Sequence, residues 1–214
     1  MARHRSTLRR RGPQVEPRPR ILLVCEGEAT ERGYFEDMRR EAHVRLIHLF
    51  VDRVHGVPKT LVRRAVELKR AAERDARRSG DINLRYDAVW CVFDVDEHPN
   101  MPEALQQAKD NGIKVAISNP CFELWLLLHF EDQRAFIDRA AAHAACRRHM
   151  PRYEKRVTYS ELKAKYADAV KRAEHLNAWQ TSRGCSGANP STTVHSLTEL
   201  IHALARTSYL VRLR

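Results

Sequence analysis

Apolar residues gather in short continuous runs along the first half of the chain, and a stretch with helical periodicity follows each run. The runs that predict strands are residues 20–25, 43–51, 87–93 and 113–117. The stretches that predict helices are residues 29–41, 58–78, 102–111 and 121–130. A continuous apolar run is typical of a strand that is buried on both faces. The alternation therefore predicts an α/β fold with a mainly parallel four-stranded sheet flanked by helices.

The pattern changes after residue 131, where helix-forming residues dominate. Residues 134–149 and 160–180 have helical spacing, and the Ser/Thr cluster at 191–193 is a typical N-cap for a last helix that ends near residue 205. We therefore divide the chain into a basic arm (1–19), an α/β core (20–132) and a C-terminal helical extension packed on the core (133–214).

The formal charge of +11 is distributed unevenly. Residues 1–20 hold seven arginines, and three prolines there are incompatible with a helix. We expect this arm to be disordered and to contact nucleic-acid phosphates, with a solubilising tail as the alternative. Residues 58–78 carry a second basic face, which a solvated helix surface explains at least as well as a nucleic-acid groove.

The composition also bears on location and on cysteine chemistry. No run approaches the roughly 18 apolar residues of a membrane span, so we expect a cytoplasmic protein with no membrane partner. Five cysteines without a C-x-x-C pair are typical of reduced thiols. His143, Cys146 and His149 are spaced three apart on a predicted helix but lack a fourth ligand, which disfavours a zinc site.

Carboxylates follow three of the predicted strands. Glu26 comes after the first strand, Asp94 and Asp96 after the third, and Glu123 after the fourth. Because parallel strands end along one edge of a sheet, these side chains are expected to converge there. Carboxylate oxygens are the ligands that Mg²⁺ and Mn²⁺ prefer, so the sequence predicts a site for one of these ions.

Other interpretations of the same residues compete. Acids at strand ends also cap the helices that follow them. Asp94-Val95-Asp96 is similar to the Asp-x-Asp of HAD phosphatases, but it lies in the middle of the chain and Glu97 follows it. A glycosyltransferase Asp-x-Asp is the other interpretation, but it leaves the strong basicity and the Glu-Gly after the first strand unexplained. Cys121 at a helix start is a conceivable nucleophile, although its apolar neighbours favour a packed thiol.

Four longer segments carry a resemblance to a known family. They are Val-Cys-Glu-Gly-Glu-Ala-Thr-Glu (24–31), Trp-Cys-Val-Phe-Asp-Val-Asp-Glu-His-Pro (90–99), Ser-Asn-Pro-Cys-Phe-Glu-Leu-Trp-Leu-Leu-Leu-His-Phe (118–130) and Asn-Pro-Ser-Thr-Thr-Val-His (189–195). Together they resemble the RloB family over about residues 20–205. The strand-Glu-Gly and strand-Asp-x-Asp layout also looks like the Toprim fold of topoisomerases, bacterial primases and OLD-type nucleases.

The resemblance implies a Toprim-like, metal-dependent nuclease of prokaryotic anti-phage defence, such as abortive-infection loci. Glu26 would be the general acid/base or first metal ligand, and Asp94, Asp96 and Glu123 would hold Mg²⁺ or Mn²⁺. Glu31 and His129 would stand behind these ligands. The substrate would be DNA or tRNA, and an AAA or SMC-like ATPase encoded nearby would be the partner.

Two further expectations complete this picture. The sequence has no G-x-x-x-x-G-K-[ST], so we expect no P-loop ATP hydrolysis by this chain. Lys155, Lys163 and Lys165 are candidates for the cation that neutralises charge on the reacting phosphate. The main rival function is a non-catalytic adaptor that binds nucleic acid or recruits the ATPase.

Overall fold

The computed structural model describes residues 18–26, 30–41, 44, 48–53, 56–95, 101–154 and 157–212. It contains one sheet, whose strands are β1 (Arg20–Cys25), β2 (His48–Arg53), β3 (Ala88–Asp94), β4 (Lys114–Asn119) and β5 (Ser191–Thr192). The strand order is β2-β1-β3-β4-β5. The first four strands are parallel to their neighbours, and β5 is antiparallel to β4. The predicted α/β class and parallel four-stranded sheet are confirmed.

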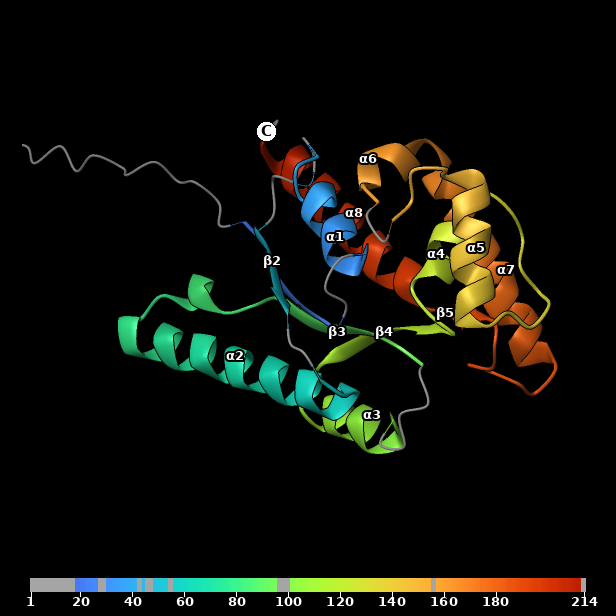
Figure 1. Cartoon of the computed structure of the whole chain (residues 1–214). Coiled ribbons are helices and arrows are strands. Elements are labelled where there is room, and N and C mark those ends of the chain that lie inside the picture. Colours follow the sequence, from blue (N-terminus) through green and yellow to red (C-terminus); the bar gives the residue numbers. More distant parts are fainter. Residues whose placement is uncertain are drawn as a thin grey trace, which may run out of the picture.

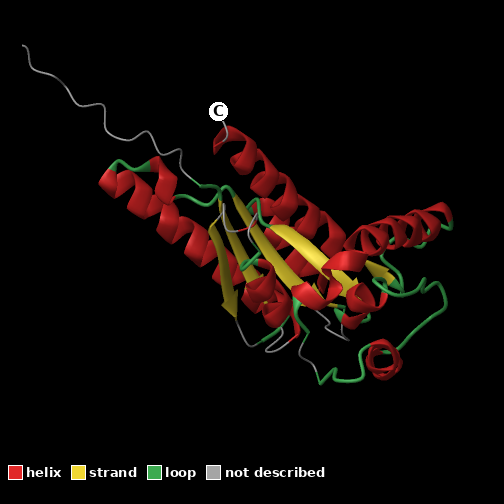
Figure 2. Ribbon diagram, turned by 90° about the horizontal axis from the view of Figure 1, so that it is seen from above, coloured by secondary structure: helices red, strands yellow, loops and turns green. Residues whose placement is uncertain are grey.

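Helices cover both faces of this sheet (Figure 1). One face carries α2 (Pro58–Ser79) and α3 (Met101–Asp110). The other face carries α1 (Thr30–Met38), α4 (Glu123–Leu127), α5 (Arg139–His149), α6 (Tyr159–Leu162), α7 (Tyr166–Ser182) and α8 (Val194–Arg212). Two 3₁₀ turns, η2 (Ile82–Leu84) and η3 (Lys163–Lys165), complete the described elements. The view from above shows α8 running along the sheet (Figure 2).

The central strand β1 shows why these apolar runs form buried strands. Its side chains alternate between two cores, because successive residues of a strand point to opposite faces. Leu23 belongs to the core under α1 and α8, whereas Leu22 and Val24 belong to the core under α2. A strand that contributes side chains to a core on each face of the sheet needs an apolar residue at every position.

The long helix α2 follows its predicted bounds closely. Pro58 stands in its first turn, where its missing N–H costs nothing, and Gly80 ends the helix with a left-handed φ of 74°. Leu61, Val62 and Ala65 are buried against the sheet. The helix therefore presents its basic residues on the side away from the sheet.

The fifth strand was not predicted. Residues 191–193 were expected to cap the last helix, and α8 does begin directly after them at Val194. In addition, Ser191 and Thr192 pair with Asn119 and Ser118 of β4. The Thr193 hydroxyl accepts a hydrogen bond from the Ile117 amide at 2.9 Å. The C-terminal part of the chain therefore supplies a sheet strand as well as helices.

Two other differences concern the ends of elements. Helix α5 begins at Arg139 rather than at residue 134, because the Asp138 side chain accepts a hydrogen bond from the Ala141 amide and caps the helix there. Strand β2 (His48–Arg53) ends two residues beyond the predicted end at residue 51, while residues 43 and 45–47 of the predicted strand lie outside the described residues. None of the described helices combines the length and the apolar character that crossing a membrane requires.

Candidate functional site

The candidate site lies at the carboxyl edge of the parallel strands. Glu26 follows β1, and its backbone amide donates to the Val92 carbonyl of β3 at 3.1 Å. Asp94 is the last residue of β3. Glu123 is the first residue of α4, which begins four residues after β4 ends. The strand ends thus bring together Glu26, Asp94 and Glu123, which are far apart in the sequence.

A fourth carboxylate, Glu31, joins them from the first turn of α1. Burial raises the pKa of Glu31 to about 7, and repulsion from Glu123 and Glu26 adds to this effect. The Glu31 carboxyl therefore takes up a proton much closer to neutral pH than an ordinary glutamate does. The repulsion from Glu123 and Glu26 indicates that both carboxylates lie close to Glu31.

Asp94 is the most strongly affected acid of this group. Burial raises its pKa well above the ordinary value, and repulsion from Glu31, Glu123 and Glu26 acts in the same direction. The Arg139 guanidinium opposes this effect, because it donates to Asp94 Oδ2 at 3.1 Å. Arg139 is the first residue of α5, and its side chain remains 45% exposed. It is thus a cation that touches the acids and still reaches solvent.

Glu123 has the opposite balance. Burial raises its pKa, but hydrogen bonds from Tyr153 and Cys121 and the nearby His143 outweigh burial, so the pKa is lowered. The Tyr153 hydroxyl donates to Glu123 Oε1 at 2.5 Å. His143 Nε2 lies 3.6 Å from the same oxygen. Glu123 is therefore held ionised and in a fixed orientation at a site that is only 4% exposed.

The other predicted residues have varied positions. Asp96 and Lys155 lie outside the described residues, as do residues 1–17 of the basic arm. Lys163 forms an ion pair with Glu41 at 2.8 Å, and Lys165 lies over the Phe130 ring. Neither lysine is the cation beside Asp94, which is Arg139.

His129 packs in the core rather than behind the acids. Its Nδ1 lies 3.0 Å from the Trp125 carbonyl oxygen, and its ring packs edge-on against Trp125 and Tyr34. Burial lowers its pKa to about 4. This histidine is therefore neutral near pH 7.

The structure also bears on the two cysteine-based alternatives, the Cys121 nucleophile and the zinc site. Burial raises the pKa of the Cys121 thiol far above its ordinary value, which removes the reactivity that a nucleophile needs. The Cys146 thiol donates to the Glu123 carbonyl, while His149 pairs with Glu131. Cys146 and His149 therefore have separate partners.

The four carboxylates fit a divalent cation in donor chemistry and in charge. Carboxylate oxygens suit Mg²⁺ and Mn²⁺, and a cation would relieve the repulsion that raises the pKa of Asp94 and Glu31. Within the described ranges, no group of three His, Cys, Asp or Glu side chains is already arranged to hold a metal ion. A complete ligand set would need Asp96 or side-chain rotations at these positions.

Sequence reasoning missed Arg139, Tyr153 and His143. Each reaches the site from residues 139–153, which follow the strand region that carried the motifs. Nothing in the sequence distinguishes Arg139 from the many other arginines. Only the packing of α5 against α4 identifies it.

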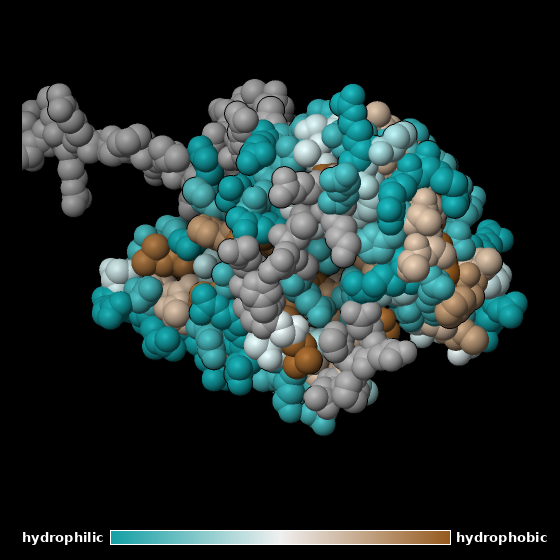
Figure 3. All heavy atoms as spheres, viewed as in Figure 1, coloured by the Kyte–Doolittle hydropathy of each residue, from teal (hydrophilic) through white to brown (hydrophobic). Residues whose placement is uncertain are grey.

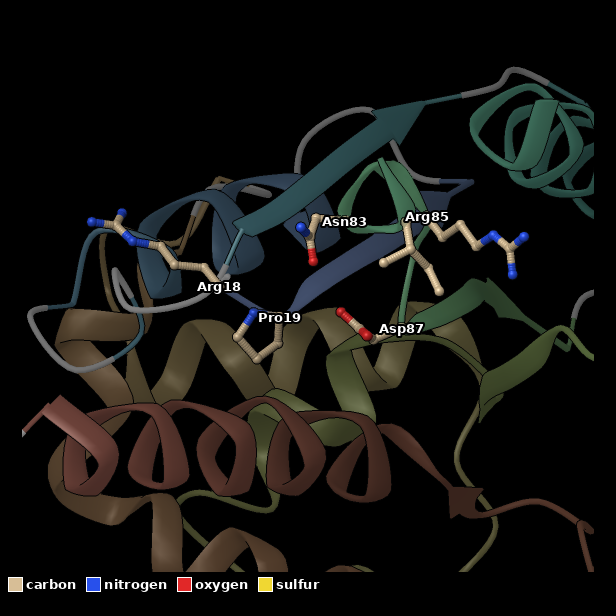
Figure 4. Close-up of a pocket in the computed structure, with 6 residues that line it drawn as sticks. Arg18, Pro19, Asn83, Arg85 and Asp87 are labelled. Carbon is tan, nitrogen blue, oxygen red and sulfur yellow. The ribbon is translucent and has the colours of Figure 1, made fainter. Parts of the chain in front are cut away.

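A second hollow lies at the opposite, amino edge of the sheet (Figure 4). It has a volume of about 290 Å³, and its lining comes from the segments that precede β1 and β3. The Arg18 and Arg85 side chains extend away from it in opposite directions (Figure 4). The Asp87 carboxylate accepts from the Arg20 amide at 2.7 Å. This hollow therefore lacks the grouped acids of the carboxyl edge.

Comparison with known proteins gives one match. The family model described as RloB-like protein matches residues 21–201, a range that includes Glu26, Asp94, Asp96 and Glu123. No curated protein and no solved structure matches the chain.

Proposed function

The chain belongs to the RloB-like protein family, and from this premise we propose that it is a metal-dependent nuclease that hydrolyses phosphodiester bonds of DNA or RNA. The observation that carries the proposal is the grouping of Glu26, Glu31, Asp94 and Glu123 at one edge of the sheet, close enough that their repulsion helps to raise the pKa values of Glu31 and Asp94. Buried carboxylates in mutual repulsion cost stability, and such groups cluster at functional sites. The Toprim-like relation is part of the same proposal.

The described residues divide the work as follows. Glu26, Asp94 and Glu123, with Asp96, would hold Mg²⁺ or Mn²⁺. When bound, this ion would polarise the scissile phosphate and stabilise its developing charge. Tyr153 and His143 keep Glu123 ionised and correctly oriented. Glu26 would act as the general acid/base or as the first ligand.

Arg139 is the cation that this proposal places beside the reacting phosphate. Its guanidinium contacts Asp94, and 45% of its side chain is exposed to solvent. Arginine presents several N–H donors in a planar array that matches phosphate oxygens. The exposed part of the Arg139 side chain would contact a phosphate at the same edge of the sheet.

The proposal extends to the biological setting that the family resemblance implies. The chain would act in prokaryotic anti-phage defence, and an AAA or SMC-like ATPase would control it. A toxic nuclease needs such restraint until infection is sensed. The ATPase would release this restraint.

The decisive experiment compares wild-type protein with Glu26→Gln. Supercoiled plasmid, single-stranded DNA and total tRNA are incubated with Mn²⁺ or Mg²⁺, with EDTA as the chelator control. We expect wild-type cleavage of at least one substrate and a loss of about 100-fold or more in Glu26→Gln, because acid–base groups contribute on that scale. EDTA should abolish the activity.

A matched control uses another glutamate of the same region. Glu36 lies on α1 in an ion pair with Arg32 at 2.6 Å and outside the acid cluster. Glu36→Gln should cleave like wild type. Calorimetry should show Mn²⁺ binding that is weakened in Asp94→Ala. A folded wild-type protein that binds no metal would contradict the nuclease proposal.

The adaptor is the second candidate, and one observation favours it. Asp94 is already paired with Arg139, and Glu123 is already bonded to Tyr153, as in a purely structural network. An adaptor would keep its nucleic-acid affinity in EDTA and cleave nothing, with or without the ATPase. Cleavage that appears only when the ATPase is added would support the nuclease.

A further inference from the structure

A hollow of about 480 Å³ lies next to the acid cluster, and Tyr153 separates the two. The Tyr153 side chain lines this hollow, while its hydroxyl donates to Glu123 Oε1 on the other side. The rest of the lining comes from the end of α5, from α6 and η3, and from Phe130 after α4. We call it the Tyr153 pocket. Its volume is in the range of pockets that hold a small organic group.

One wall of the Tyr153 pocket is a preformed aromatic stack. The Phe130 and His149 rings are nearly parallel, with centroids 4.8 Å apart and an interplanar angle of 11°. His149 Nε2 lies 3.1 Å from Glu131 Oε2. The His149 side chain is 28% exposed. A further planar ring can therefore extend this stack from the pocket.

The rim of the Tyr153 pocket is positively charged. Arg152 and Lys165 line it, against Glu161 as the single acid among the lining residues. Neither cation forms an ion pair with any residue in the described ranges, and Lys165 Nζ lies 4.2 Å from the Phe130 centroid. Lys163, two residues away, is instead neutralised by Glu41 at 2.8 Å. The two rim cations are thus available to an anionic ligand.

From this geometry we propose that the Tyr153 pocket binds one unpaired nucleotide of the nucleic acid on which the acid cluster acts. The base extends the Phe130–His149 stack, and its phosphate lies between Arg152 and Lys165. A planar ring joined to an anion is the ligand that an aromatic wall and a cationic rim select together. A base held in a duplex cannot enter, so the substrate class is single-stranded nucleic acid or an unpaired loop.

This inference rests on the proposed function for the position of the scissile phosphate, but the pocket can be tested without cleavage. The probe is a 12-nucleotide single strand with one 2-aminopurine, bound in EDTA and followed by anisotropy and by the quenching of 2-aminopurine on stacking. A duplex of the same sequence is measured in parallel. The protein is the full chain throughout.

Three variants and one control define the expected result. Arg152→Ala and Lys165→Ala should each weaken single-strand binding by about 3–10-fold, because each removes a phosphate contact. His149→Ala should weaken it by roughly 5-fold or more and abolish the quenching, because a stacked base contributes on that scale. Lys163→Ala removes the same charge outside the pocket and should bind like wild type. Duplex affinity should change less than twofold in all four variants.

The outcomes separate the two proposals. Wild-type affinity in Arg152→Ala and Lys165→Ala, or equal losses for single strand and duplex, would overturn the pocket assignment. Retained quenching in a folded His149→Ala would do the same. Pocket-dependent binding without any metal-dependent cleavage, with or without the ATPase, would support the pocket assignment and contradict the nuclease proposal. Thermal unfolding of each variant shows whether it is still folded. Arg152→Ala is the variant least expected to affect folding, because Arg152 is exposed.

Discussion

Glu31 and His129 show how burial acts in opposite directions on an acid and a base. Burial disfavours the charged form of either group, so it raises the pKa of Glu31 to about 7 and lowers that of His129 to about 4. Between about pH 4.5 and pH 7 the folded protein binds more protons at Glu31 than the unfolded chain does. At His129 the folded protein binds fewer. Their contributions to the pH dependence of stability therefore oppose each other.

The His129 contribution has a defined sign. Its folded pKa lies below the unfolded value of 6.5, so its stabilising effect is present above pH 6.5 and is lost as the pH falls toward 4. Each tenfold change in proton affinity corresponds to about 1.4 kcal/mol, so the loss approaches roughly 3 kcal/mol. We expect the stability difference between wild type and His129→Asn to shrink over this range. Urea unfolding at intervals from pH 7.5 to pH 4 measures it, and a constant difference would refute the assignment.

At single positions, sequence reasoning found the acids but not their partners. Glu26, Asp94 and Glu123 could be predicted because strand ends share one edge of a parallel sheet. Arg139 and Tyr153 could not, because their contacts depend on how the segment after α4 folds back over the site. For His129, the family resemblance implied a role behind the metal ligands, whereas the turn after α4 places its ring in the core.

At the scale of elements, apolar runs predicted four strands and left out the fifth. A two-residue strand has no periodicity to detect, and β5 depends on long-range bonds. Asn177 of α7 donates from Nδ2 to the Thr192 carbonyl at 2.7 Å, and its Oδ1 accepts from the Thr192 amide at 3.4 Å. The strand is therefore held by β4 on one side and by a helix side chain on the other.

We expect Asn177→Ala to lower the free energy of unfolding by about 1–3 kcal/mol, the cost of leaving a buried backbone group without a partner. Thr192 is only 1% exposed, so water cannot easily replace the missing bonds. Chemical denaturation measures the change. Asn83→Ala, an exposed substitution in η2, is the control and should cost less than about 0.5 kcal/mol. Equal stabilities of the two variants would contradict this role for Asn177.

On the scale of the whole molecule, the distribution of positive charge bears on where nucleic acid would bind. The face seen in Figure 3 is largely hydrophilic, and the chain carries a formal charge of +11. Residues 1–17 hold five arginines, namely Arg3, Arg5, Arg9, Arg10 and Arg11. On α2, Arg64 pairs with Asp52 at 2.8 Å, and Arg70 donates to the Asn111 side chain at 3.1 Å. Part of the α2 charge is thus engaged within the fold.

We expect residues 1–17 to bind phosphates in a salt-sensitive way. Replacing them with a neutral Gly/Ser segment of equal length should reduce the slope of log K against log salt concentration by about 0.9 for each duplex-DNA phosphate that the arm no longer neutralises. The double variant Arg74→Gln, Arg77→Gln removes charge from the exposed side of α2 and should leave the slope nearly unchanged. A larger effect of the α2 variant would assign the electrostatic surface to that helix instead.

The late arrival of β5 has a consequence for synthesis on the ribosome. Thr192 bonds to Ser118 across a separation of 74 residues, so the nascent sheet is complete only after the intervening chain has emerged. At ordinary translation speeds this interval lasts roughly 4–15 s. During it the β4 edge is open and can pair with another nascent chain. We therefore expect nascent chains of this protein to be most prone to edge-to-edge association during this interval.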